Sequence, residues 1–356
     1  MPVSAEELWP RNAWYLAAWN NEIRDRPLGR TILNEEIVFF RNQEGRIVAL
    51  EDRCCHRGAP LSLGVVTSMG LQCNYHGMTF DNSGKCVWIP SQDSIPSHMK
   101  VKHYRIAERQ PFVWIWMGDP ERADEGKLLS FPCEEEYRNG PHYYEMVPVK
   151  CDFRLLVDNL MDLTHITFLH RNTIGGVGET ELTEVKTEMA YTDGGVKFIR
   201  WTLGQAAPPI YVKALRLGPN AKLDRWADFE YIAPTNIVQW TGAAESGRGA
   251  QQNRHQAEQF SFRILHSATP ETENSCFYFW MRANPTNADV ATLPRIHQQI
   301  AATVAEDVAM LEGQHSRLAA YVDRSLVDVK SDQIRIMARR ALRRMIEKDA
   351  PEKVDS

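Results

Sequence analysis

Two short loops, each with one Cys and one His, carry the strongest chemical signal in this sequence. Cys54 and His56 are separated by one residue, and after a gap of sixteen residues Cys73 and His76 are separated by two. Two thiolates and two imidazoles that meet from two loops form a four-ligand metal site. A structural zinc ion and a two-iron, two-sulfide cluster both accept this ligand set.

We favour the iron–sulfur cluster, in which Cys54 and Cys73 bind one iron and His56 and His76 bind the other. Imidazole is a neutral ligand, so this cluster carries less negative charge and accepts electrons at a higher potential than an all-thiolate cluster. Cys55 lies between two of the ligands and could compete for the metal. The short spacing of Cys54 and His56 favours Cys54, which leaves Cys55 as a thiol beside the cluster.

A second group of candidate ligands lies in the segment Phe153–Leu169 and the His that follows it. The leucine spacing of the segment predicts a helix. On this helix Asp158, Asp162 and His165 lie near one face, where a metal ion would give these polar groups a partner. His170 lies about 140° further around an ideal helix than His165, so the helix is expected to end or distort before it. For either His alone, a hydrogen-bonded core histidine is the plainer interpretation.

The third ligand is expected from a helix predicted over Leu293–Ala320, whose apolar residues form a continuous stripe. Asp307 lies about 60° from Val304 in this stripe and is expected to point inward, whereas Glu306 lies about 200° away and is expected to face solvent. Two His and one carboxylate leave positions on an iron ion open for dioxygen and a substrate. A buried ion pair is the plainer interpretation of Asp307 alone.

The first third of the chain is expected to consist of short β-strands that position the Cys/His loops. Strand patterns cover Thr31–Arg41, Arg46–Glu51, Leu71–Cys73, Met78–Phe80, Cys86–Ile89 and Phe112–Met117. Turn residues lie at 42–45 and 81–84. A charged stretch follows the last of these strands, and we place a domain boundary near residue 120.

The remainder mixes strands and helices, so the predicted fold class is α+β. Strands are predicted at Val196–Leu203, Trp226–Ile232, Asn236–Thr241, Phe260–Leu265 and Cys276–Met281. A last helix is predicted over Ser331–Lys348. Its arginines, which we interpret as a solvated helix face, are Arg339, Arg340, Arg343 and Arg344.

Composition narrows the class of protein. The chain has 356 residues, a net charge of −5 and 7 cysteines. The charge gives no reason to expect a nucleic-acid partner, and the cysteines are too sparse for a disulfide scaffold. We see no signal peptide in Met1–Asn12 and no apolar run long enough to span a membrane. We therefore expect a cytoplasmic protein of two domains.

Taken together, the two constellations resemble the Rieske non-haem iron oxygenases, in their α-subunits, over nearly the whole chain. The motifs that carry the resemblance are Arg57–Ser62, Tyr75–Gly77, the Asn159/Asp162/His165/His170 segment and Glu306–Asp307. Within the family the chain is similar to the short aromatic O-demethylases, the vanillate and dicamba demethylase oxygenase components. The features shared with that branch are Arg11–Tyr15, the absence of Trp after Gly77, Leu156–Leu163 and Thr269–Glu273.

The resemblance implies an all-β Rieske domain at 1–120 and a catalytic domain at 121–356 with an antiparallel sheet and helices, of the helix-grip, START-like type. It implies a [2Fe-2S] cluster, a mononuclear Fe(II), dioxygen as co-substrate, and NADH or NADPH acting through a reductase that holds flavin and a ferredoxin-type cluster. The implied activity is O-demethylation of a small methoxylated aromatic acid such as vanillate, by a homotrimer.

The resemblance also assigns roles to single residues. Asp162, with Asn159 beside it, is implied in catalysis, because its carboxylate would bridge His76 and an iron-ligating His across a subunit boundary. His266 and Asn236 fall where the branch contacts polar groups of the substrate. Basic residues near the cluster loops could guide an acidic reductase, although ordinary solvated side chains explain them equally well: Arg53, Arg57 and Lys85.

Other functions remain open at this point. A Rieske hydroxylase or N-demethylase acting on another aromatic compound would share every motif above. An electron-transfer protein would use the first domain alone, and a zinc-stabilised interaction protein would use neither redox centre.

Overall fold

The computed structural model of the chain describes residues 8–171, 173–174, 185–206, 218, 220–254, 260–322 and 324–349. The described residues form two compact units, each treated separately below. The first comprises 8–128, 269–273 and 348–349, and the second comprises the described parts of 129–268 and 274–347. The finer division at residues 120 and 121 stays a prediction.

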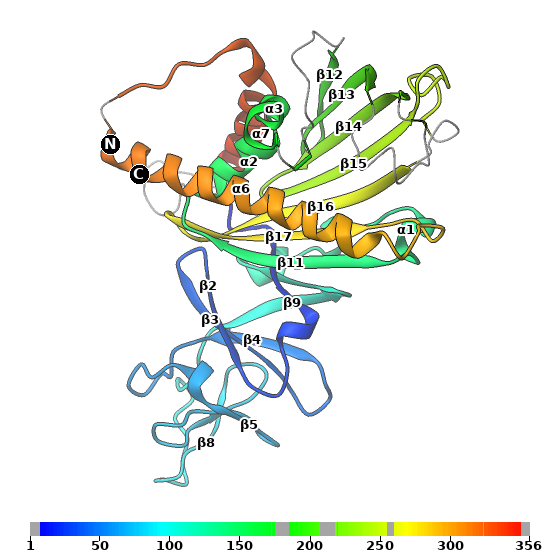
Figure 1. The fold of residues 1–356 in the computed structure, drawn as a ribbon. Coiled ribbons are helices and arrows are strands. Elements are labelled where there is room, and N and C mark those ends of the chain that lie inside the picture. The colour runs from blue at the N-terminus through cyan, green and yellow to red at the C-terminus, as the bar shows by residue number, and fades with distance from the viewer. Residues whose placement is uncertain are drawn as a thin grey trace. The chain divides into compact units, whose positions relative to one another are not determined.

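The first unit contains two antiparallel sheets (Figure 1). The larger has the strand order β1-β10-β9-β4-β3-β2, and the smaller has the order β5-β6-β7-β8. The strands of the larger sheet are β1 Trp14–Trp19, β2 Leu28–Ile32, β3 Glu35–Arg41, β4 Ile47–Glu51, β9 His103–Arg109 and β10 Phe112–Trp116. Those of the smaller are β5 Val65–Thr67, β6 Gly70–Gln72, β7 Thr79–Phe80 and β8 Cys86–Trp88. The 3₁₀ turns are η2 Asn20–Glu22, η3 Leu61–Leu63, η4 Pro120–Arg122 and η5 Glu125–Lys127.

The prediction of one strand over Thr31–Arg41 was wrong, because β2 and β3 are separate strands joined by a tight turn. Leu33 and Asn34 at this turn have φ angles of 53° and 63°. Two successive positive φ angles make the two-residue turn that matches the twist of a hairpin, and Asn tolerates this conformation well. Sequence patterns also missed β1, whose residues are all buried and therefore show no alternation.

The second unit consists of a seven-stranded antiparallel sheet with helices, as predicted. Its strand order is β11-β17-β16-β15-β14-β13-β12. The strands are β11 His142–Val149, β12 Val185–Thr192, β13 Gly195–Ala206, β14 Lys222–Ile232, β15 Asn236–Glu245, β16 Phe260–Thr272 and β17 Ser275–Ala283. The helices are α1 Glu135–Arg138, α2 Phe153–Leu160, α3 Ile166–Leu169, α6 Leu293–Ala320 and α7 Gln333–Asp349, with 3₁₀ turns η6 Leu163–His165 and η7 Lys330–Asp332.

Helix α6 is confirmed with the predicted ends, and it lies across the sheet with α2, α3 and α7 gathered at one end (Figure 1). Its buried residues include Ile296, Val304, Asp307 and Leu311, which follow the predicted stripe. None of the helices in the described ranges is long and apolar enough to span a membrane.

The continuous helix predicted over Phe153–Leu169 was wrong, because the chain leaves the helix after α2. Asp162 has an extended backbone, with φ −129° and ψ 103°. Its carboxylate accepts hydrogen bonds from the backbone N–H of Thr164 (2.9 Å) and from the Thr164 hydroxyl (2.7 Å). A short acidic side chain that caps the next turn competes with continuation of a helix. Asp162 therefore ends one helical segment and begins the next.

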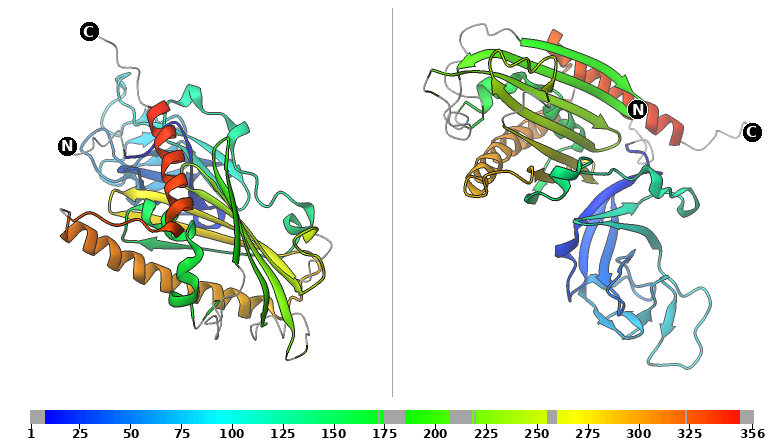
Figure 2. Two further views of the ribbon diagram at one scale, coloured as in Figure 1. Left: turned by 90° about the horizontal axis from the view of Figure 1, so that it is seen from above. Right: turned by 90° about the vertical axis from the view of Figure 1, so that its right-hand side faces the viewer.

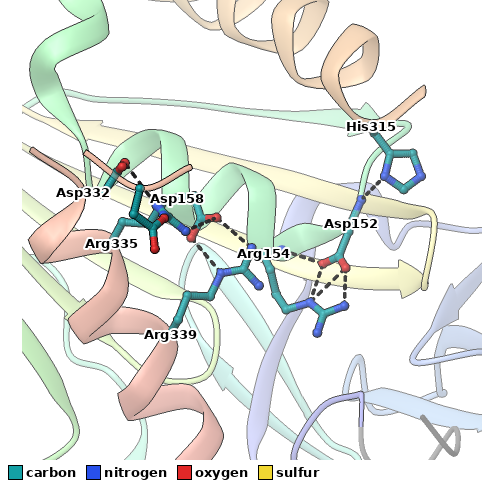
Figure 3. A network of polar contacts seen from close by, with 8 residues as sticks. Asp152, Arg154, Asp158, His315, Asp332, Arg335 and Arg339 are labelled. Carbon is teal, nitrogen blue, oxygen red and sulfur yellow. Dashed lines mark hydrogen bonds and ion pairs between the residues drawn. The ribbon is translucent and has the colours of Figure 1, made fainter. Parts of the chain in front are cut away.

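The expected solvated face of α7 was wrong at Arg339. Its guanidinium group donates two hydrogen bonds of 2.7 Å to the two carboxylate oxygens of Asp158 on α2 (Figure 3). Arg335, one turn earlier, lies 3.8 Å from the same carboxylate. Figure 2 shows α7 beside α2. Asp158 thus anchors α7 and does not join the metal-ligand face predicted for it, whereas Arg340, Arg343 and Arg344 are exposed as expected.

Candidate metal centres and substrate cavity

The two Cys/His loops of the first unit have the same backbone hydrogen-bond pattern. In the first, the N–H of Gly58 donates to the carbonyl of Cys54, and in the second the N–H of Gly77 donates to the carbonyl of Cys73, both at 2.9 Å. Both glycines have positive φ angles, 69° and 76°, which glycine adopts without strain. The two loops are therefore turns of the same length from Cys to Gly, and the His lies two residues after the Cys in the first and three residues after it in the second.

The four predicted cluster ligands divide into a buried pair and an exposed pair. Cys54 and Cys73 are 3% and 2% exposed and belong to the apolar core of the unit. His56 and His76 are exposed, and their ring centroids lie 4.7 Å apart. This division fits a two-iron cluster that would have both thiolates on one iron and both imidazoles on the other.

The chemistry of the thiol pair also fits a bound metal. Burial raises the pKa of Cys54 to about 11, and the neighbouring Cys73 adds to the rise, although a backbone hydrogen bond at His56 favours the thiolate. Two buried thiols side by side become thiolates when a metal cation neutralises them. Cys55, by contrast with Cys54 and Cys73, is exposed, and its expected role as a thiol beside the cluster stays a prediction.

In the second unit, His165, His170 and Asp307 come together as the predicted triad. One ligand atom from each lies within 4.8 Å of the others. The Nε2 atoms of His165 and His170 lie 3.6 and 3.1 Å from Oδ1 of Asp307. His170 and Asp307 are buried, with 1% and 9% of their side chains exposed. Two imidazoles and one carboxylate around one point are the donor set of a mononuclear iron site.

The outer nitrogen of each imidazole has its own acceptor, and this fixes which nitrogen faces the triad. Nδ1 of His165 donates to the backbone oxygen of Asp162, and Nδ1 of His170 donates to Oε2 of Glu306 at 2.7 Å. Each Nε2 therefore faces Asp307 and is the nitrogen that would bind a metal ion held between them. Burial lowers the pKa of His165, and Asp307 only partly opposes this. For His170 the carboxylates of Asp307 and Glu306 outweigh burial, so its pKa is raised.

The expectation that Glu306 faces solvent was wrong. Besides His170, its Oε2 atom accepts a hydrogen bond of 2.8 Å from the Thr173 hydroxyl. The angular argument treated α6 alone, whereas the chain around His170 packs against the side of the helix and the long Glu side chain reaches it. The one feature of the sequence that points to this contact is that Glu306 directly precedes the predicted ligand Asp307.

Asn159 on α2 contacts the triad at Asp307. Its amide Nδ2 donates to Oδ1 of Asp307 at 3.0 Å, while its Oδ1 is buried without a hydrogen-bond partner among the described residues. This contact holds the carboxylate of Asp307 in place from the α2 side. Asp162 acts on the triad from its main chain, because its side chain is engaged with Thr164.

Substitution of Glu306 by Gln is expected to weaken ferrous-ion binding about 10- to 100-fold, because a neutral amide orients and polarises His170 less than a carboxylate does. A competition titration with a ferrous chelator measures this affinity, and the thermal unfolding of the variant, followed by circular dichroism, reports on folding. Glu347→Gln, on the exposed face of α7, removes the same charge away from the site and serves as the control. Equal ferrous affinity of the two variants would contradict the role given to Glu306.

A cavity of about 180 Å³ lies beside the triad, between α6 and the sheet. Its walls are mainly apolar, with Leu160, Phe229, Phe262, Ile264 and Val304 among the lining residues. A cavity of roughly 150 Å³ holds benzene, so this one suits a single substituted aromatic ring. The triad residues themselves line one part of it.

Of the two predicted substrate contacts, the structure places His266 in the cavity wall and Asn236 outside it. Gln239 and Thr241 of β15 line the cavity. Side chains alternate between the two faces of a strand, so Asn236, an odd number of residues away, points to the opposite face. The structure therefore does not bring Asn236 into the wall of this cavity, and a contact between Asn236 and the substrate stays a prediction.

His266 has a hydrogen-bond partner on each ring nitrogen, and the sequence analysis did not predict these two partners. Its Nδ1 accepts from the hydroxyl of Tyr278 at 2.7 Å, and its Nε2 donates to Oε1 of Gln239 at 2.9 Å. Burial lowers the pKa of His266 to about 3, so the ring is neutral at pH 7. Both partners come from neighbouring strands, and no sequence motif marks them.

Each of the two units contains a segment that matches a known protein family. Residues 13–104 match the Rieske [2Fe-2S] domain, and residues 149–348 match the vanillate O-demethylase oxygenase C-terminal domain. The chain is 36% identical to the vanillate O-demethylase oxygenase subunit of a Pseudomonas species, over 95% of each chain. It is 35% identical to the iron-sulfur subunit of the toluene-4-sulfonate monooxygenase system of Comamonas testosteroni, over 90% of this chain and 92% of that one.

A solved structure agrees over the same length. The crystal structure of dicamba monooxygenase bound to 3,6-dichlorosalicylic acid matches with a TM-score of 0.84 and 30% identity, over 96% of this chain and 99% of that one. The resemblance inferred from the motifs is thereby confirmed. The chain belongs to the Rieske oxygenases of the vanillate O-demethylase type, and it is the oxygenase component of a multicomponent monooxygenase.

Proposed function

We propose that this protein O-demethylates a small methoxylated aromatic acid of the vanillate type. The observation that carries the proposal is the ring-sized, largely apolar cavity that shares a wall with His165, His170 and Asp307. In the proposed reaction one oxygen atom of dioxygen enters the methyl C–H bond, and the other leaves as water with two electrons and two protons. The resulting hemiacetal breaks down to formaldehyde and a phenol.

We propose that Cys54, His56, Cys73 and His76 hold the [2Fe-2S] cluster and that His165, His170 and Asp307 hold a ferrous ion. When bound, these groups supply electron transfer and dioxygen activation. A reductase supplies the electrons from NADH or NADPH, and we propose that it holds flavin and a ferredoxin-type cluster. We further propose that the protein is cytoplasmic.

The chain's own residues hold the second centre in place. Glu306 accepts a hydrogen bond from the Nδ1–H of His170, the main-chain oxygen of Asp162 accepts one from the Nδ1–H of His165, and Asn159 donates one to Asp307. We propose that the chain forms a homotrimer in which Asp162 connects His165 to His76 of a neighbouring copy. Its main-chain oxygen binds His165, and the carboxylate oxygen that Thr164 does not engage would reach His76. The apolar cavity walls exclude water from the ring of the substrate.

The test is formaldehyde release by the purified oxygenase with a reductase, NADH and a panel of methoxybenzoates that includes vanillate. We expect formaldehyde and the matching phenol in equal amounts from at least one member, and none without reductase. The similarity to a toluene-4-sulfonate monooxygenase favours a second candidate, hydroxylation of a methyl group on an aromatic sulfonate. Toluene-4-sulfonate in the same panel would then yield an alcohol. This product together with no formaldehyde from any methoxybenzoate would overturn O-demethylation.

A further inference from the structure

Two arginines from neighbouring strands line the cavity on its sheet side, Arg200 of β13 and Arg225 of β14. In the strand register Arg200 lies opposite Ala227, and Thr202 lies opposite Arg225. Arg200 and Arg225 are therefore diagonal neighbours on one face of the sheet, about 7–8 Å apart. Arg side chains are long enough for both guanidinium groups to reach the same small anion from these two backbone positions.

The small side chain between them leaves space for that anion. Ala227 lies opposite Arg200 on one side and opposite Thr241 of β15 on the other. Ala227, Thr202 and Thr241 also line the cavity. We call the space over the small Ala227 side chain the recess; its neighbours on this face of the sheet, by strand register, are Arg200, Thr202, Arg225 and Thr241.

The charge of the cavity wall agrees with an anionic ligand. Among the described lining residues the carboxylate is that of Asp307, which belongs to the triad. One N–H group of Arg200 donates to the carbonyl of Leu163 at 2.6 Å and holds the side chain in position. His266 supplies no positive charge, because it is neutral and both its nitrogens are engaged. The planar fork of Arg matches the oxygen pair of a carboxylate or sulfonate.

We propose that Arg200 and Arg225, together with Thr202 and Thr241, bind the anionic substituent of an aromatic substrate, either a carboxylate or a sulfonate. The inference rests on the proposed function for the position of the reacting group, at the His165–His170–Asp307 triad. The ring then lies between the two ends of the cavity, so a substrate without the anion loses both affinity and orientation.

Equilibrium binding under anaerobic conditions tests this assignment without turnover. Isothermal titration calorimetry compares 4-methoxybenzoate and toluene-4-sulfonate with the neutral methyl ester of 4-methoxybenzoate. Arg225→Gln is expected to weaken binding of the recognised anion about 10- to 100-fold, the usual effect of hydrogen bonds to a charged group, and to change ester binding less than about threefold. Arg225→Lys keeps the charge without the fork and is expected to fall in between. Arg340→Gln, an exposed change of equal charge on α7, is the control.

A loss confined to 4-methoxybenzoate would assign the recess to carboxylates, and a loss confined to toluene-4-sulfonate would assign it to sulfonates. Equal losses for ester and anion would overturn the proposal, as would unchanged anion binding or a wild-type protein that binds neither anion. If Arg225→Gln does not fold, the comparison of Arg225→Lys with the wild type decides. Anion binding that depends on Arg225 in a protein that releases no formaldehyde would support the recess and contradict the proposed demethylation.

Discussion

Substitution of Asp307 by Ala is expected to remove the mononuclear iron and abolish turnover while the cluster remains intact. The substitution deletes one of the three proposed ligands, the carboxylate whose Oδ1 lies 3.6 and 3.1 Å from the Nε2 atoms of His165 and His170. The effect on metal affinity should exceed the roughly 10- to 100-fold cost of losing an outer hydrogen-bond partner. The iron content should fall from about three to about two irons per chain, and the acid-labile sulfide content should stay at about two per chain.

The visible spectrum of the cluster provides the internal control for this experiment, because Asp307 lies in a different unit from the Cys/His loops. Glu347→Ala removes an exposed carboxylate of the second unit and should keep all three irons. A fully loaded Asp307→Ala protein that still holds its third iron would contradict the assignment of the triad.

Substitution of Cys73 by Ser is expected to abolish the cluster, with loss of its visible absorption, both sulfides and two irons per chain. Cys73 is buried beside Cys54, and a Ser hydroxyl in that apolar core does not ionise to replace the thiolate. Cys55→Ser is the matched control, since it removes an exposed thiol from the same region. We expect the cluster of the Cys55→Ser protein to be indistinguishable from that of the wild type.

The control also tests the ligand assignment itself. A Cys55→Ser protein without a cluster, or a Cys73→Ser protein with one, would show that the spacing argument chose the wrong sulfur. A Cys73→Ser protein that folds and retains the mononuclear iron would show that the second centre forms independently of the first.

Those parts of the fold could be predicted from the sequence whose residue pattern lies within a single helix or loop. Helix α6 has a continuous apolar stripe, so its ends and the inward direction of Asp307 follow from helical geometry alone. The paired Cys/His loops are equally local, because each ligand pair lies within one turn. The contact between Glu306 and His170 joins two segments 136 residues apart in sequence, and periodicity within α6 contains no information about it.

The break after α2 and the substrate contacts show two other limits. Asp162 is compatible both with a helix interior and with a cap, and its extended backbone decides between them. Asn236 was chosen by approximate spacing, and a shift by an odd number of residues turns a strand side chain to the other face. Gln239 and Tyr278 were missed because their hydrogen bonds to His266 depend on the strand order β15-β16-β17.

A single turnover without the reductase tests the central claim most directly. The fully loaded oxygenase is reduced chemically, freed of reductant, and mixed with dioxygen and the methoxybenzoate panel. We predict that formaldehyde and the matching phenol form in equal amounts as the cluster spectrum returns to its oxidised form, and that Asp307→Ala forms neither. Reoxidation of the cluster with no product from any member of the panel would contradict the claim that the two centres of this chain act together in oxygenation.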